Sequence, residues 1–84
     1  MSIKQAIGEQ IRNARIKKKK TQIEVSEATG LSRSYISDIE NGRYTPSVET
    51  LVVLASYLDL NLKFLSKMTE IQDKQQEVWK WKQQ

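Results

Sequence analysis

The segment 21–32 contains a helix start, a helix stop and a second helix start, and this spacing constrains the fold more than any other feature. Thr21, followed three residues later by Glu24, has the form of a capping box. Gly30 suits the left-handed conformation that follows a helix C-terminus. Ser32 is then a good N-cap for the next helix. The sequence therefore predicts two short helices joined by a tight turn.

Apolar residues recur at helical spacing in most of the chain, and no long stretch alternates with a period of two. In the first segment they fall on one face and predict a helix over about residues 2–18, with its inner face at Ile3, Ile7, Ile11 and Ala14. The helix that starts at Ser32 is expected to end at Asn41–Gly42 and to bury Ile36 and Ile39.

The second half of the chain predicts further helices. Thr45 and Pro46 suit the N-cap and first residue of a fourth helix, because proline fits the first helical position. Its core stripe is expected at Leu51, Leu54, Ala55 and Leu58. A fifth short helix is expected to hold Leu62 and Leu65, and residues 67–84 either extend as another helix or fray. We therefore expect one all-α domain over residues 1–66 and a C-terminal helical extension over residues 67–84.

Composition excludes several classes of site. The chain has no cysteine and no histidine, which removes disulfides, zinc sites built on those ligands, the cysteine nucleophile and the commonest general base. We see no Gly-rich phosphate loop and no clustered carboxylates, so we expect no enzyme, no metal and no cofactor. The longest apolar run, Leu51–Ala55, is far shorter than the roughly 20 residues of a membrane span. With no signal peptide visible, we expect a cytoplasmic protein without membrane contact.

Positive charge is concentrated at one end of the chain. The net charge is +4, and residues 1–20 carry seven basic groups against one acidic group. Such a segment favours a polyanionic partner, most often nucleic acid, although a solvated charged face gives the same pattern. Within it, the run Lys17–Lys20 is either a source of long-range attraction to DNA or a solubility patch.

Two short helices joined by a turn that contains glycine are the outline of a helix-turn-helix. In that motif the second helix enters the DNA major groove, and its leading residues meet the edges of the bases. The exposed face of the helix after Ser32 carries a group of polar side chains, with Tyr35 nearby: Arg33, Ser34, Ser37 and Asp38. Arginine can donate two hydrogen bonds to guanine, and a carboxylate can accept one from the amino group of cytosine. Asp38 also repels phosphate, however, and could simply balance the charge of Arg33.

The run TQIEVSEATGLSRSYISDIENGRYTPSVETL, residues 21–51, resembles the lambdoid phage repressor–Cro family, also called the XRE family. The resemblance covers about residues 3–66 and implies a lambda-repressor-like domain of five helices that binds double-stranded DNA. It implies base contacts at Ser32, Arg33, Ser34 and Asp38. It implies contacts with the phosphate backbone at Gln22, Tyr35, Ser37, Asn41 and Arg43. To these we add Lys17, from the basic run.

The resemblance also implies an internal ion pair between Arg15 and Glu40, which would tie the first helix to the end of the recognition helix. The chain departs from the family at Ser26, where alanine is usual. Serine is nearly the same size, so the fold is not in doubt, and its hydroxyl is expected to bond back to a helical carbonyl.

A second apolar row lies outside the core stripe and points either to a dimer contact or to a cover by the C-terminal segment: Val53, Tyr57 and Phe64. The C-terminal segment continues it at heptad-like spacing with Met68, Ile71, Val78 and the neighbouring Trp79. This segment folds back on its own domain, crosses to a partner subunit or holds a regulatory partner protein. The sequence leaves these alternatives open.

Together these features predict a sequence-specific DNA-binding transcriptional regulator, a repressor that acts as a homodimer on a palindromic operator. The alternative is an antitoxin or protein-interaction module whose C-terminal tail binds a partner. Phage or mobile-element repressors, controller proteins of restriction–modification systems and antitoxins share this size and motif, and the sequence does not choose among them.

Overall fold

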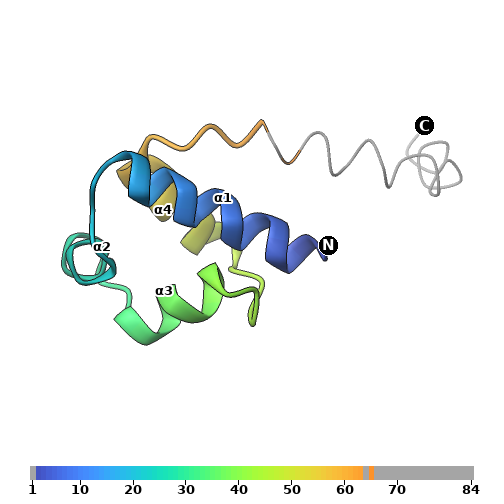
Figure 1. The fold of residues 1–84 in the computed structure, drawn as a ribbon, viewed down its shortest axis with the longest axis horizontal. Coiled ribbons are helices and arrows are strands. Elements are labelled where there is room, and N and C mark those ends of the chain that lie inside the picture. The colour runs from blue at the N-terminus through green and yellow to red at the C-terminus, as the bar shows by residue number, and fades with distance from the viewer. Residues whose placement is uncertain (1, 64, 66–84) are drawn as a thin grey trace, which may run out of the picture.

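A computed structural model of the chain describes residues 2–63 and 65. Within this range the chain forms four helices and no strand: α1 (Ile3–Lys17), α2 (Gln22–Thr29), α3 (Arg33–Glu40) and α4 (Val48–Leu58). α1 and α2 each pack against both α3 and α4. Figure 1 shows α1 across α4, α3 along the opposite edge and α2 seen nearly end-on. The predicted all-α class is confirmed, and none of these four helices is long and apolar enough to cross a membrane.

The helix signals around the central turn act as the sequence predicts. The Thr21 hydroxyl accepts from the Glu24 N–H at 3.0 Å, and the Glu24 carboxylate accepts from the Thr21 N–H at 2.9 Å. This backbone hydrogen bond holds the pKa of the Glu24 carboxyl below its ordinary value. Gly30 ends α2 in the left-handed region with φ 78°, and Ser32 caps α3 by accepting from the Tyr35 N–H at 3.0 Å. Residues 21–40 therefore form the predicted pair of helices with a tight joint.

The start predicted for the fourth helix is wrong by two residues. Ser47, not Thr45, is the N-cap, and its hydroxyl accepts from the Thr50 N–H at 3.1 Å. Pro46 lies before the cap and is buried, as is Leu51. These are the two positions of a hydrophobic staple, so the proline contributes apolar burial before the helix and not its first turn.

One core joins all four helices and consists of Ile7, Ile11, Val25, Ile36, Ile39, Leu51, Leu54 and Leu58. The inner face predicted for α1 is correct except at Ile3, which lies in the first turn and is exposed. α1 crosses the end of α3 at backbone contact distance. A Cβ added to Gly8 would lie 2.2 Å from the carbonyl oxygen of Ile39, so only glycine fits there.

After α4 the chain turns at Asp59, which adopts a left-handed conformation with φ 54°. Leu62 and Leu65 are partly buried against the core, and the Leu65 N–H donates to the Leu62 carbonyl at 3.0 Å. The rest of the expected fifth helix and the extension 67–84 lie outside the described residues. So do five of the predicted contact residues: Phe64, Met68, Ile71, Val78 and Trp79.

Candidate nucleic-acid interface

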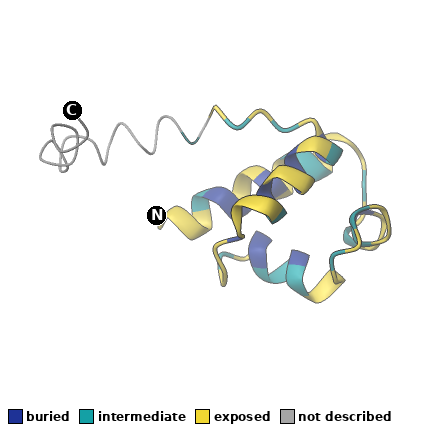
Figure 2. Cartoon of the chain, turned by 180° about the vertical axis from the view of Figure 1, so that it is seen from behind, coloured by how far each residue is buried: buried dark blue, intermediate teal, exposed yellow. Residues whose placement is uncertain are grey.

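The beginning of α3 presents its polar side chains to solvent. Ser32, Arg33 and Ser34 are exposed, whereas Ile36 and Ile39 on the opposite face are fully buried. Figure 2 shows this change along α3, from exposed at its start to buried at its end. The helix is therefore anchored by one face, and its leading end is free to meet a large, flat or grooved partner.

Side-chain hydrogen bonds fix the joint between α2 and α3. The Ser26 hydroxyl donates to the Leu31 carbonyl in the turn at 2.5 Å. Thr29 donates to the Val25 carbonyl at 2.7 Å and accepts from the Leu31 N–H at 3.3 Å. The bond predicted from Ser26 back to a helical carbonyl is therefore wrong. No backbone N–H among the described residues donates to the turn carbonyl of Leu31, and the serine hydroxyl supplies a donor for it.

The ion pair expected between Arg15 and Glu40 is present and enclosed. Arg15 Nε donates to Glu40 Oε2 at 2.7 Å and Nη2 to Oε1 at 3.0 Å, with side chains only 14% and 3% exposed. The hydrogen bond with Glu40 raises the pKa of Arg15, against the opposing effect of burial. Arg15 Nη1 also donates to the Lys20 carbonyl at 2.8 Å. One guanidinium thus joins α1, the joint to α2 and the end of α3.

Gln22 belongs to the same buried network. Its side-chain amide donates to Glu40 Oε1 at 3.2 Å, which links the first residue of α2 to the last residue of α3. The amide has a second N–H, so this brace leaves a donor for the phosphate contact that the resemblance implies. That contact stays a prediction.

Asp38 and Arg43 form a second pair, which the sequence analysis did not anticipate. Arg43 Nη1 donates to Asp38 Oδ1 at 2.8 Å, and the side chains of Arg43 and Asp38 are 66% and 27% exposed. The sequence predicts a base contact for Asp38 and a phosphate contact for Arg43, as two separate contacts. The signal that could have revealed the pair is their spacing, because the two charges flank Gly42, the residue expected just after the helix end.

Three more of the residues predicted to contact DNA phosphates, besides Gln22 and Arg43, also have partners within the domain. The Tyr35 ring packs partly against the core, and its centroid lies 6.5 Å from that of Tyr44. The Asn41 side-chain amide donates to the Ser37 carbonyl at 2.9 Å. The sequence analysis did not predict the contact of Tyr35 with Tyr44, which is exposed. The signal that could have revealed it is an aromatic residue next to Arg43 in the loop after α3.

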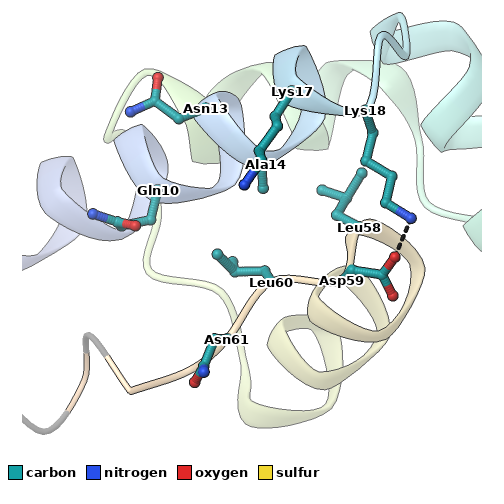
Figure 3. Close-up of a pocket in the computed structure, with 9 residues that line it drawn as sticks. All are labelled: Gln10, Asn13, Ala14, Lys17, Lys18, Leu58, Asp59, Leu60 and Asn61. Carbon is teal, nitrogen blue, oxygen red and sulfur yellow. Dashed lines mark hydrogen bonds and ion pairs between the residues drawn. The ribbon is translucent and has the colours of Figure 1, made fainter.

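Lys17 lies at the end of α1, beside an open hollow of about 620 Å³. Figure 3 shows the hollow between α1 and the residues that end α4, with Lys18 reaching across to an ion pair with Asp59. Lys17 is exposed and has no ion-pair partner among the described residues. It remains available for the phosphate contact predicted for it.

The apolar row predicted outside the core is divided in the structure. Val53 is exposed, whereas Tyr57 is half-buried and packs against the core. Val48 and Val52 are exposed as well, and with Val53 they line one side of a groove that Thr29 and Leu31 close from the other side. We call these three valines the α4 apolar patch.

The family profile described as "Helix-turn-helix" matches residues 11–65 of the chain. The "ImmF control region 10 kDa protein" of Bacillus phage phi105 is 50% identical over 66 residues, which cover 79% of this chain and 72% of that protein. The "Immunity repressor protein" of the same phage is 38% identical over 72 residues, covering 84% of this chain and 50% of that protein.

A bacterial relative shows the same similarity. "Transcriptional regulator ClgR" of Mycobacterium tuberculosis strain H37Rv is 37% identical over 60 residues, covering 71% of this chain and 54% of that protein. The chain thus spans most of the phage 10 kDa protein and about half of the other two relatives. The similarity to these two relatives is confined to part of their length.

Proposed function

The chain belongs to the XRE-type helix-turn-helix family of DNA-binding transcriptional regulators, and we propose that it is a repressor that binds a palindromic operator as a homodimer. In this proposal the leading end of α3 enters the major groove, with Ser32, Arg33, Ser34 and Asp38 at the base edges. A repressor bound there blocks RNA polymerase.

The observation that carries this proposal is the exposure of the start of α3. Ser32, Arg33 and Ser34 are exposed on a helix whose other face is fixed by Ile36 and Ile39. Arginine at such a position can donate two hydrogen bonds to guanine. In this proposal six residues supply phosphate contacts: Tyr35 and Ser37 on α3, Asn41 and Arg43 just after it, Gln22 at the start of α2, and Lys17 at the end of α1.

A homodimer would contact enough base pairs for a specific site, whereas a single subunit would not. One α3 reads only a few base pairs, whereas two copies about 34 Å apart read successive major grooves on one face of the duplex. The α4 apolar patch is a surface that a second subunit could cover, since exposed apolar patches commonly mark interfaces. In this proposal the segment predicted as a fifth helix and the extension 67–84 add to the dimer contact.

Selection of bound sequences from a random DNA pool, followed by sedimentation of the complex, tests the proposal. We expect two half-sites related by a two-fold axis and two chains per duplex. Retention of no duplex would rule out the DNA-binding role. A monomer both free and on the selected site would rule out the dimer.

Arg33 and Lys17 distinguish base contacts from phosphate contacts on the selected site. Arg33→Ala should weaken specific binding by about 1–3 kcal/mol and relax the preference at one base pair. Lys17→Ala should weaken binding to all sequences alike and reduce its dependence on salt. Equal loss on matched and mismatched sites for Arg33→Ala would contradict base recognition by this residue.

The second candidate is an antitoxin or interaction module whose C-terminal tail binds a partner protein, and the exposed α4 apolar patch is the observation that favours a protein contact. Truncation after Lys67 separates the two candidates. Loss of a partner protein with operator affinity intact would favour the interaction module. A joint loss of dimerisation and operator affinity would favour the repressor dimer. The name of the phage immunity repressor, a relative of this chain, supports the repressor.

A further inference from the structure

The way α3 ends brings Asp38 and Arg43 together. The Gly42 N–H donates to the Ile39 carbonyl at 3.0 Å, and the Arg43 N–H donates to the Asp38 carbonyl at 2.9 Å. Gly42 is left-handed with φ 74°. These are the two hydrogen bonds of a Schellman motif, which places the residue after the glycine beside the last turn of the helix. An apolar contact usually joins those two side chains, and here an ion pair takes its place.

The ion pair uses only part of each charged group. Arg43 Nη1 bonds to Asp38 Oδ1, and within the described part of the chain no donor bonds to Asp38 Oδ2. Arg43 Nε and Nη2 likewise have no acceptor among the described residues. A carboxylate only accepts hydrogen bonds and a guanidinium only donates them. The pair therefore presents free carboxylate lone pairs beside several guanidinium donors, and Asp38 lies on the same helix as Arg33 and Ser34.

The charges of the pair also matter at a DNA surface. A lone carboxylate on α3 would repel the phosphates on both sides of the groove. Arg43 Nη1 offsets that charge through its 2.8 Å contact with Asp38 Oδ1, and Asp38 Oδ2 accepts from no donor among the described residues. The guanidinium keeps donors for phosphate oxygens, which it binds well because of its planar fork.

Building on the proposed function, we propose that Asp38 and Arg43 act on DNA as one reading unit for a C·G base pair. Arg43 neutralises and orients the carboxylate, and Asp38 Oδ2 accepts a hydrogen bond from the N4 amino group of cytosine. Adenine is the poorer partner because its N6 donor lies next to the N7 acceptor, which repels a carboxylate. Arg43 is then a positioning residue for specificity as well as a phosphate contact.

Base preference on the selected duplex tests the first half of the proposal. Each position of the half-site is replaced in turn, and affinity is measured for the wild type and two variants. We expect the wild type to require cytosine at one position and Asp38→Asn to shift that preference to adenine, which an amide pairs with through two hydrogen bonds. Arg43→Ala should reduce discrimination at that same position about tenfold. A preferred base that is unchanged in Asp38→Asn would overturn the proposal.

A double-mutant cycle tests the coupling. Arg43→Ala should reduce affinity at least about threefold more in the wild type than in Asp38→Asn, where no carboxylate is left unpaired. Glu27→Gln is the matched control, because Glu27 is exposed on α2 and joins no ion pair with a described residue. In the Glu27→Gln background, Arg43→Ala should reduce DNA affinity by the same factor as it does in the wild type.

The outcomes separate the two proposals. Equal losses for Arg43→Ala in the wild type and in Asp38→Asn would overturn the reading unit and leave the DNA-binding role intact. A wild type that retains no duplex from the pool would overturn both. Thermal melting of each variant shows whether it is folded, and both side chains are exposed enough for the fold to tolerate their replacement.

Discussion

The C-terminal ends of α1 and α3 share one backbone motif, but the charged side chain at the start of the motif points inward in α1 and outward in α3. At the end of α1, the Lys19 N–H donates to the Ile16 carbonyl at 2.9 Å and the Lys20 N–H to the Arg15 carbonyl at 3.1 Å. This is the Schellman pattern that also ends α3. In each helix the residue at the start of this pattern is charged. Arg15 turns inward to Glu40, whereas Asp38 turns outward to Arg43.

The difference between the two pairs is burial. The Arg15–Glu40 pair is almost fully enclosed and cross-links two helices, so loss of one partner leaves a charge without compensation in a poorly solvated place. The Asp38–Arg43 pair is open to solvent, where ion pairs add little to stability. One pair therefore holds the scaffold together, and the other is available to a partner. Four predictions test this contrast.

Removing one member of the enclosed pair should have the largest effect. Arg15→Met leaves the Glu40 carboxylate buried and unpaired, and we expect a loss of about 3–5 kcal/mol in the free energy of unfolding. Chemical denaturation measures it. The double variant Arg15→Met/Glu40→Leu should be less destabilised than the single one, because no charge remains buried. A single variant that loses less than about 1 kcal/mol would place this pair in the same class as surface pairs.

The close crossing of α1 over the end of α3 should be nearly as sensitive. A Cβ at position 8 meets the backbone oxygens of Ile39 and Glu40, which cannot move aside as a side chain can. Gly8→Ala should therefore destabilise the fold by about 2–3 kcal/mol. Thermal melting shows whether Gly8→Ala lowers or raises the stability of the fold. At an unhindered position inside a helix, alanine in place of glycine would instead stabilise the fold by about 1 kcal/mol.

Replacing Lys19 at the end of α1 with glycine should stabilise the fold, by less than the preceding variants destabilise it. Lys19 has φ 58°, a conformation that costs a non-glycine residue about 1 kcal/mol, whereas α3 already has Gly42 at the equivalent place. Lys19→Gly should raise the free energy of unfolding by up to about 1 kcal/mol. Lys20→Gly is the control, because Lys20 lacks a positive φ and should gain nothing.

The exposed pair should give the smallest effect on the fold. Arg43→Ala should change the free energy of unfolding by about 0.5 kcal/mol or less, since the backbone motif around Gly42 does not depend on the side chain. Arg12→Ala, which removes an exposed arginine from α1, is the matched control. Destabilisation by Arg43→Ala as large as that by Arg15→Met would contradict the division between scaffold and surface pairs.

Local signals in the sequence predicted much of this structure. The capping box at Thr21, the stop at Gly30 and the start at Ser32 involve residues close together in the chain, so they depend little on the rest of the fold. The same approach was wrong at Thr45–Pro46 because Ser47 is an equally good local N-cap and the burial of Pro46 decides between them. It also missed the bond from Ser26 to Leu31, which depends on the path of the turn.

The sequence by itself determined the helical class, the position of α3 and the polar residues at its exposed start. Tertiary structure decided which charges face inward and with whom they pair. Arg15 and Glu40 are 25 residues apart, and their contact exists only because α1 packs against α3. Gln22 reaches the same carboxylate because α2 also packs against α3, whereas Asp38 stays at the surface. Short-range backbone preferences set the helix ends, but the cost of removing a charge from water depends on what the fold brings around it.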